Sequence, residues 1–567
     1  MKSVGNKLKR VAWRATLYLQ EVVKVPRNIK LNLNFWSIAS FMILLLLLLP
    51  NLNILAGLLE EPTENWLHIR TYLLQSYIKN SLVLVGATAV MTIITGTLLA
   101  YLVAFYDFPL RGFMRWALIL PLAVPPYMAA YTYSGIVSFT GPIQTFLRNT
   151  VGVSPNQKYF QIMSPEGAVF IFSLFLYPYV YLMVKAFFEK QSSALIESAQ
   201  LLGRSPVEIL IYTLLPLARP AIIGGVSLVI MEVLNDYGVV HYFGIPVFST
   251  AIFRAWFGMG DLNSAIKLAG LLMILVFATV VIEKLLRGRL SFSYSKSAVR
   301  PLVPRRLHKT PAILALTFCL LIFSFGFVIP VFQLFYWGLL TYRSILNYEF
   351  IASLFNSVML AGITSSVIVI LALIIGNFAR ISTNQLGNIV SRIALIGYSI
   401  PGTVIAIGVV TFFIQMDSRI YWLYKPIIGG SKKLVLSTSI VMLVFAYIIR
   451  FLAIGYNAVD SGFEKIGRKY FEASRTLGAN IARTFLLVDL PMLKPAVTGG
   501  FILVFVDILK ELPLTLILRP FNFHTLATKA FQYANDEMVQ EAAIASLIII
   551  TVSFLSIYLF YKTAERT

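Results

Sequence analysis

Four acidic residues lie inside long apolar segments of this 567-residue chain, where a charged group is costly. Glu232 and Asp236 are four residues apart, and Asp507 and Glu511 repeat that spacing. An ionisable group at the centre of a membrane helix costs about 2.5–3.5 kcal/mol on insertion scales, so such residues are functional candidates. Residues at i and i+4 share one face of an α-helix. The spacing therefore predicts that each pair of acids lies on one helical face within the membrane, where all four are candidates for a functional site.

The same acids have structural explanations that the sequence leaves open. Lys510 is close to two of them along the chain and would neutralise one acid in an ion pair. Alternatively, the four carboxyl groups lie at the outer end of the membrane, or form hydrogen bonds that hold two parts of the protein together.

The composition is that of a membrane protein. The chain is 58% hydrophobic and 13% charged, whereas soluble chains carry about 25% charged and 45–50% apolar residues. This balance excludes a disordered chain, a nucleic-acid-binding domain and an ordinary soluble enzyme. The single cysteine, Cys319, excludes a disulfide framework and a cysteine metal cluster.

The apolar segments predict an all-α integral membrane fold with about 12 transmembrane helices. A span needs about 20 mostly apolar residues, and helices satisfy their own backbone in lipid. We expect spans near 36–58, 81–106, 113–134, 166–187, 219–240 and 264–285, and then near 312–340, 355–379, 391–413, 434–457, 495–518 and 542–561.

Basic clusters divide these spans into two groups and orient them. The net charge is +22, and the segments 1–34 and 286–310 carry eight and seven Lys or Arg but one and no acid, respectively. The positive-inside rule places both in the cytoplasm. The sequence thus predicts a cytoplasmic basic N-terminal segment (1–35), a first transmembrane half (36–285), a basic cytoplasmic linker (286–311) and a second half (312–567). An even number of spans puts both termini in the cytoplasm, although the segment 414–433, expected outside, is also basic.

The two halves are internal repeats. When the chain is shifted by 275 residues, nine of the 29 positions from 197 to 225 are identical, where composition alone would give roughly two or three. Pro126 falls on Pro401 at the same offset, and Asn80-Ser81 falls on Asn356-Ser357 at 276. The four acids also align, acid on acid. We therefore expect two homologous halves of about six helices with the same membrane orientation.

The strongest repeated motif lies in a cytoplasmic loop between the fourth and fifth spans of each half. Its first copy consists of Glu197, Ser198, Ala199, Gly203, Leu215 and Pro216, and its second of Glu472, Ala473, Ser474, Gly478, Leu490 and Pro491. The pattern predicts a short helix that ends at the glycine. A second helix follows, capped by Ser205 with Glu208 in the first copy and by Asn480 in the second. Each loop would project a compact knob into the cytosol.

These residues resemble the EAA loop of ABC importer permeases, with Ser198 and Ser474 each replacing one alanine. The resemblance implies the type I importer permease fold. It also implies that each loop docks into a groove of an ATPase subunit and transmits ATP-driven closure to the membrane helices. In such permeases the fifth span of each half lines the translocation path, so we expect the four acids of these spans to form a ring around it that attracts cations and disfavours anions. Double-length permeases with one loop per half are similar to ferric iron and thiamine importers, and the segment Leu120–Tyr127 looks closer to the ferric branch.

The resemblance also implies the partners. The chain has no GxxxxGK[ST] phosphate-binding loop, so we expect no cofactor of its own, with ATP bound by two copies of a separate ABC ATPase. A periplasmic or surface-tethered binding protein would deliver the substrate, and a bacterial inner membrane would be the location. No nucleic-acid partner is expected.

Three alternatives stay open at this point. The cargo could be thiamine or another small cationic or phosphonate solute. A secondary transporter driven by an ion gradient can also have about twelve helices in a duplicated chain. A membrane-embedded enzyme would need convergent catalytic groups, and the sequence indicates none. His241 and His524 follow the fifth span of their halves but do not align at the repeat offset, so we predict no metal site.

Overall fold

The computed structural model describes residues 34–287, 303–382, 385–428 and 434–565, with side chains omitted at 423–428 and 560–565. The predicted basic N-terminal segment 1–35 and most of the linker 286–311 lie outside the described residues. The described part is almost entirely helical. Its two strands, β1 (Tyr106–Asp107) and β2 (Arg305–Arg306), form one short parallel pair.

Ten helices in the described part are long and apolar enough to cross a membrane. They include α2 (Phe35–Gly57), α4 (Leu74–Phe105), α8 (Pro165–Glu189), α11 (Leu215–Asn235) and α14 (Leu262–Arg287), followed by α15 (Thr310–Phe323) continuing into α16 (Ile329–Ile345), α17 (Tyr348–Ile381), α19 (Gly402–Ile428), α20 (Ile440–Ile466) and α23 (Leu490–Leu509). Several begin at a polar cap: the Asn34 and Asn347 side chains accept from backbone N–H groups of α2 and α17, which satisfies donors that a helix start leaves free.

Two predicted spans, 113–134 and 391–413, are wrong as continuous helices. In the first half, the segment Arg111–Ala123, which includes α5 (Arg111–Ala117), meets the segment that begins with α6 (Pro126–Val137) at 91°. In the second half, Pro401 separates α18 (Gln385–Ser399) from α19. Proline lacks an N–H and disfavours helical backbone at the preceding residue, which explains both breaks. The last span, α26 (Ala543–Glu565), has a shorter apolar part, Ala543–Leu559.

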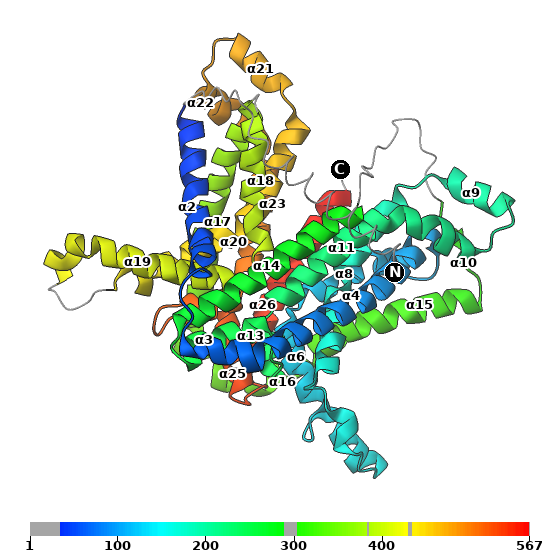
Figure 1. Cartoon of the computed structure of the whole chain (residues 1–567). Helices are drawn as coiled ribbons and strands as arrows, with labels where there is room; N and C mark the ends of the chain where they lie inside the picture. Colours follow the sequence, from blue (N-terminus) through cyan, green and yellow to red (C-terminus); the bar gives the residue numbers. More distant parts are fainter. Residues whose placement is uncertain (1–33, 288–302, 383–384, 429–433, 566–567) are drawn as a thin grey trace, which may run out of the picture.

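Each half contributes its first helix to the core of the other half. Leu44 and Ile54 of α2 pack in one hydrophobic core with residues of α17 and α20, and the rings of Phe41 and Phe378 are 5.7 Å apart. Reciprocally, Leu334 of α16 is buried in the core formed by α4 and α8. Figure 1 shows α2 standing beside α17 and α18 of the second half. The sequence pattern did not indicate this exchange.

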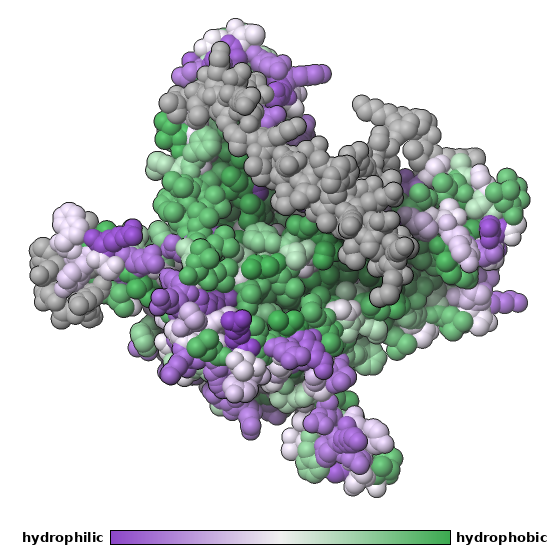
Figure 2. Space-filling model, viewed as in Figure 1, coloured by the Kyte–Doolittle hydropathy of each residue, from purple (hydrophilic) through white to green (hydrophobic). Residues whose placement is uncertain are grey.

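The two bundles diverge toward one end of the molecule. There, α9 (Ser193–Leu201) and α21 (Lys469–Thr476) project at two widely separated points (Figure 1). Figure 2 shows hydrophobic side chains over the middle of the molecule and hydrophilic ones gathered on its projecting ends. This distribution fits a protein whose middle contacts lipid, because large exposed apolar patches are typical of protein surfaces that contact a membrane.

Candidate translocation cavity and coupling loops

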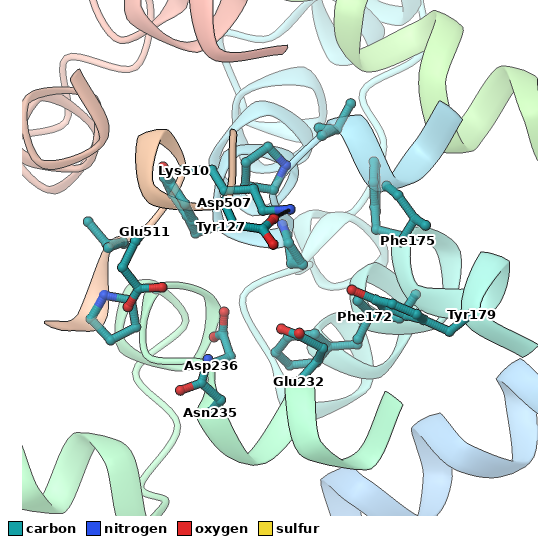
Figure 3. Close-up of a pocket in the computed structure, with 18 of the residues that line it drawn as sticks. Tyr127, Phe172, Phe175, Tyr179, Glu232, Asn235, Asp236, Asp507, Lys510 and Glu511 are labelled. Carbon is teal, nitrogen blue, oxygen red and sulfur yellow. Dashed lines mark ion pairs between the residues drawn. The ribbon is translucent and has the colours of Figure 1, made fainter. Parts of the chain in front are cut away.

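All four predicted acids line one cavity where the two halves meet. The cavity has a volume of about 110 Å³. Glu232 and Asp236 reach it from the end of α11, and Asp507 and Glu511 from the end of α23. Figure 3 shows the four carboxyl groups turned toward the same space. Much of the remaining wall comes from apolar and aromatic residues, among them Phe172, Phe175 and Tyr179 of α8.

The second acid of each pair lies just past its helix, since α11 ends at Asn235 and α23 at Leu509. The backbone N–H of Asp236 still donates to the Glu232 carbonyl at 3.0 Å, so the first pair keeps the predicted helical spacing. The backbone N–H of Glu511 donates instead to the Ile508 carbonyl at 3.2 Å, which breaks the predicted shared face in the second half. Asp236 Oδ1 accepts from the backbone N–H of Val239 at 2.9 Å, at the start of α12 (Gly238–Tyr242).

Glu511 makes the matching contact in the second half. Its Oε1 accepts from the backbone N–H of Leu514 at 3.2 Å, at the start of α24 (Pro513–Leu518). A carboxylate at a helix start satisfies an N–H that would otherwise be free. These two acids therefore have a local structural role as well as a place in the cavity wall.

Two basic side chains, both from the second half, pair with cavity acids. Lys510 Nζ lies 2.7 Å from Asp507 Oδ1, which is the ion pair left open from the sequence. Arg450 of α20, which sequence reasoning missed, lies with its Nε 3.3 Å from Glu511 Oε2. Its position inside an apolar span was the signal that would have identified it. The cavity thus combines four carboxyl groups with two basic groups, a formal charge of −2.

Polar contacts also join the two halves across the cavity. Asn235 Oδ1 accepts from the backbone N–H of Gly402 at 2.6 Å and from Arg450 Nη1 at 2.8 Å. The Tyr398 hydroxyl donates to Glu232 Oε1 at 3.4 Å. A side chain added at Gly402 would meet Arg450 Nη1 at 2.9 Å, so glycine allows this close approach. The sequence left open that the acids form hydrogen bonds between two parts of the protein. Glu232 forms such a bond, because Tyr398 belongs to the other half.

The two halves contribute unequally to the cavity. At the repeat offset of 275, Lys510 corresponds to Asn235 and Arg450 to Phe175, and all four residues line the cavity. The first half thus supplies neutral side chains at the positions where the second half supplies cations. Acids stand at both matched positions in each half, whereas the two basic groups occur in the second half only.

The first predicted loop has the local structure that its sequence indicates. The helix α9 ends just before Gly203, which has φ +79°, a conformation that glycine adopts at little cost. Ser205 then begins α10 (Pro206–Glu208) with the predicted capping box. Glu208 Oε2 accepts from the Ser205 N–H at 2.8 Å, and Ser205 Oγ accepts from the Glu208 N–H at 3.3 Å. Leu215-Pro216 open α11.

The second loop repeats this arrangement. The helix α21 precedes Gly478, which has φ +86°, and Asn480 Oδ1 accepts from the Arg483 N–H at 2.8 Å to cap α22 (Ile481–Thr484). Leu490-Pro491 open α23. No residue of α9 or α21 is buried. Leu202 and Leu477, which align at the repeat offset, are 83% and 88% exposed.

The serines that depart from the alanine pattern are accommodated locally. Ser198 Oγ donates to the Ala194 carbonyl at 2.7 Å within α9, and Ser474 Oγ lies 3.0 Å from Thr484 Oγ1. Glu197 and Glu472 are exposed on the same two helices as these serines. His241 and His524, at which the sequence predicts no metal site, do not line the cavity, and His524 Nδ1 is 2.6 Å from Arg519 Nη1.

Several known proteins are similar to this chain. It is 25% identical over 493 residues to the Fe(3+)-transport system permease protein FbpB 2 of Haemophilus influenzae, covering 86% of this chain and 90% of that one. A putative ferric transport system permease protein, FbpB 1, of the same organism is 22% identical over 76% of this chain and 69% of its own length. A probable sulfate transport system permease protein of Nephroselmis olivacea is 26% identical over 36% of this chain and 69% of its own length.

Similarity to solved structures is weaker, and the family is shown by sequence. A bacterial alginate ABC transporter, solved with an alginate pentasaccharide-bound periplasmic protein, contains a chain that aligns with 45% of this one and 94% of its own length, at 14% identity and a TM-score of 0.36. The sequence profile of the binding-protein-dependent transport system inner membrane component matches twice, at residues 93–282 and 368–567. The chain therefore belongs to this family of ABC importer permeases, with two copies of the family domain fused in one polypeptide.

Proposed function

We propose that this permease translocates ferric iron that a periplasmic or surface-tethered binding protein delivers. We further propose that two copies of a separate ABC ATPase drive it through the loops at Glu197–Gly203 and Glu472–Gly478. ATP is bound by those partners, and the chain itself performs no catalysis. The coupling proposal rests on the two protruding loops. Each consists of an exposed helix, a glycine with positive φ and a second helix that leads into the membrane.

The surface chemistry of the loops supports docking of a partner. Each loop presents an exposed leucine, Leu202 or Leu477, directly before its left-handed glycine. The helix that follows each loop continues toward α11 or α23, whose far ends carry the cavity acids. A force applied at a loop would therefore reach the cavity along a helix. ATP-driven closure would bring the two loops together and open the halves on the opposite side.

The charge of the cavity and the named relatives support a ferric cargo. The formal charge of −2 favours a cation over an anion, and carboxylate oxygens are the ligands that hard cations prefer. Two of the relatives that align with most of the chain are named as ferric permeases, and a third is named only as a probable ABC transporter permease. The partly covered sulfate permease shows that the family as a whole also serves other solutes.

The proposed orientation places the loops, the linker and both termini in the cytoplasm of a bacterial cell. The linker follows α14 and precedes α15, and α9 and α21 lie at the end where the two bundles diverge (Figure 1). The chain is a multi-pass membrane protein, and the positive-inside rule supports this direction of insertion.

Uptake of radiolabelled ferric iron in cells with and without this gene tests the substrate, with thiamine uptake measured in parallel. Loss of iron uptake alone supports the proposal, and loss of thiamine uptake alone replaces iron by thiamine. Uptake that is driven by an ion gradient, without an ATPase that co-purifies, would instead favour a secondary transporter.

Coupling is tested by the double variant Leu202→Glu, Leu477→Glu. Both side chains are exposed, so folding should be unaffected, while a charge in the docking surface should prevent the ATPase from co-purifying. The matched control is Phe521→Glu, which is 97% exposed in the loop between α24 and α25 (Leu526–Asn535). Equal ATPase recovery with both variants would refute docking at the loops.

A further inference from the structure

A repeated pair of polar residues, Asn80-Ser81 and Asn356-Ser357, lies in the second span of each half and does not line the cavity. In the first half, Asn80 Nδ2 donates to the Pro246 carbonyl at 3.0 Å, and Ser81 Oγ accepts from the backbone N–H of Phe248 at 3.4 Å. Phe248 is the first residue of a short helix, α13 (Phe248–Phe253). The pair therefore fixes the start of α13 against α4.

The second half repeats both contacts. Asn356 Nδ2 donates to the His524 carbonyl at 3.3 Å, and Ser357 Oγ accepts from the backbone N–H of Leu526, the first residue of α25, at 2.7 Å. A serine or asparagine within a helix can bond its own helix, but in each half these side chains bond a segment 166 to 169 positions away. The contacts therefore set where α13 and α25 lie.

The sixth residue of each of these helices is a phenylalanine that packs against Tyr237 of the first half. The rings of Tyr237 and Phe253 are stacked, with their centroids 3.7 Å apart. The ring of Phe531, on α25, lies 6.1 Å from that of Tyr237 and 6.2 Å from that of Tyr127. Phe531 thus reaches from the second half into an aromatic group of the first, where aromatic pairs add stability beyond the area that they bury.

This aromatic group lies directly beyond the cavity acids. Tyr237 and Leu512 each follow the second cavity acid of their half in the chain. A Cβ at Gly238 would lie 2.4 Å from Tyr127 Cβ and 3.0 Å from Leu512 Cδ2, so glycine allows the two halves to meet closely here. Figure 1 shows α6, α13 and α25 at the end of the molecule remote from α9 and α21.

We define Tyr127, Tyr237, Leu512 and Phe531 as the outer closure. Each of the four is at most 5% exposed. By contrast, the side chain of Asp507, one turn nearer to the coupling loop on α23, is 24% exposed. The cavity is thus closed on the side of α13 and α25 and more open on the side of the coupling loops.

The helices that hold α13 and α25 contact the coupling loops near their opposite ends. The Tyr101 hydroxyl of α4 donates to the Pro206 carbonyl of the first loop at 3.2 Å. Arg380 of α17 donates to Asp489, just before α23, at 2.7 Å. Both helices are continuous between these contacts and the Asn-Ser pairs, over about 30–35 Å at 1.5 Å per residue. A movement of either helix would therefore reach both a coupling loop and the outer closure.

We propose that the two Asn-Ser pairs are positioning residues of the transport path, which hold α13 and α25 so that the outer closure stays shut until the halves move. This inference rests on the proposed function, because it takes the cavity as part of the path. Substrate that enters from outside must pass the outer closure, so Phe531 must separate from Tyr237 and Tyr127 in each transport cycle. Each pair ties one phenylalanine of the aromatic group to a helix that also contacts a coupling loop.

Passive influx of Tl⁺ into liposomes that contain the purified full-length chain tests the closure, with Tl⁺ as a monovalent cation suited to a cavity of negative formal charge. We expect Ser81→Ala with Ser357→Ala to raise the influx at least about tenfold, because the closed state loses two hydrogen bonds of ordinary strength. Ser81→Thr with Ser357→Thr keeps both hydroxyl groups and should restore low influx. The control Thr92→Val with Ser353→Ala removes buried hydroxyl groups that bond their own helices and should leave the influx low.

Two further variants keep the test decisive. Asn80→Ala with Asn356→Ala removes the other contact of each pair and should raise the influx in the same way, even where the serine variant fails to fold. Phe531→Ala removes a ring of the outer closure itself and should also raise the influx. The midpoint of thermal unfolding is measured for every variant. An influx that rises only where this midpoint falls would refute the positioning role.

The outcomes separate this inference from the proposed function, because the assay contains no iron, binding protein or ATPase. Raised influx in the serine, asparagine and Phe531 variants, with unchanged unfolding midpoints, supports the inference. Raised influx in Phe531→Ala alone would refute the role of the Asn-Ser pairs, and low influx in all variants would refute the outer closure. Iron uptake that does not require the gene would refute the ferric cargo and leave the closure unaffected.

Discussion

Arg380 and Asp489 form a buried ion pair at the base of the second coupling loop, with Arg380 Nη1 donating to Asp489 Oδ1 at 2.7 Å. The guanidinium also stacks over the ring of Phe471 on α21, 5.2 Å from its centroid. It donates further to the Gly467 carbonyl at 3.3 Å. One arginine at the end of α17 therefore joins the start of the loop, its projecting helix and the segment that leads into α23.

Breaking this ion pair should destabilise the second loop. Asp489→Leu alone leaves the Arg380 charge buried without its partner, which costs about 3–5 kcal/mol, and should lower the midpoint of thermal unfolding in detergent. The double variant Arg380→Met, Asp489→Leu should recover most of the loss, because Leu214 is the residue that the first half has at the position of Asp489. A single variant as stable as the unmodified protein would contradict the prediction.

Neutralising Glu232 and Asp507 should slow cation transport without disturbing assembly. We expect Glu232→Gln with Asp507→Asn to reduce iron uptake at least about tenfold, because a neutral cavity no longer attracts cations. The amount of permease in the membrane and the co-purified ATPase should not change. The exposed Glu61→Gln is the control. Unchanged uptake rate and selectivity in the double variant would show that these acids have no role in the path.

The two left-handed glycines should be required for docking. Neither Gly203 nor Gly478 has a heavy atom within 4 Å of the position that a Cβ would take, so alanine adds backbone strain alone, about 1–2 kcal/mol for each residue. That strain should turn α9 and α21 and reduce ATPase recovery, measured by co-purification. Gly499→Ala also adds a methyl group to open space, but within a helix, and should have no effect. Equal recovery in all three variants would disprove the requirement.

Acid should weaken the contact between α3 (Glu64–His68) and the start of α14. Asp261 Oδ2 accepts from Thr63 Oγ1 and Ser264 Oγ, each at 2.7 Å. Burial raises the pKa of Asp261, but these hydrogen bonds outweigh burial, and its net pKa is lowered. A carboxyl group with a lowered pKa contributes stability above its unfolded pKa and loses it as pH falls through the folded value.

The measurement compares thermal unfolding of the unmodified protein and Asp261→Asn as pH falls from 6 to about 3, across the usual range of an aspartate pKa. The unmodified protein should be the more stable at pH 6, and the difference should shrink below about pH 4. A difference that stays constant with pH would show that ionisation of Asp261 does not contribute.

The sequence predicts the local structure of the coupling loops well, because it depends on neighbouring residues. Gly203 and Ser205 act within a few residues of their own positions, and so does Asn480. The acids were harder to interpret. Their spacing predicts a shared helical face only if the helix continues, and in the second pair the helical hydrogen bonding stops before Glu511.

Contacts between distant segments could not be predicted from one sequence. The pairing of Arg450 with Glu511 and the hydrogen bond of Asn235 to Gly402 join residues far apart in the chain. Their partners follow from how the halves pack, and hydropathy carries no information on that packing. Proline chemistry predicts helix breaks at Pro126 and Pro401. From the sequence we nevertheless expected continuous spans there, because the apolar run continues through both prolines.

The exchange of α2 and α16 between the halves has a consequence for biogenesis. When the ribosome has made only the first half, α4 and α8 have been inserted without α16, whose residues fill part of their core, and α2 has no second half to pack against. The first half therefore lacks part of its core until α16 and α17 have been synthesised. For the same reason, a protease cut in the linker would leave two fragments that remain clasped together.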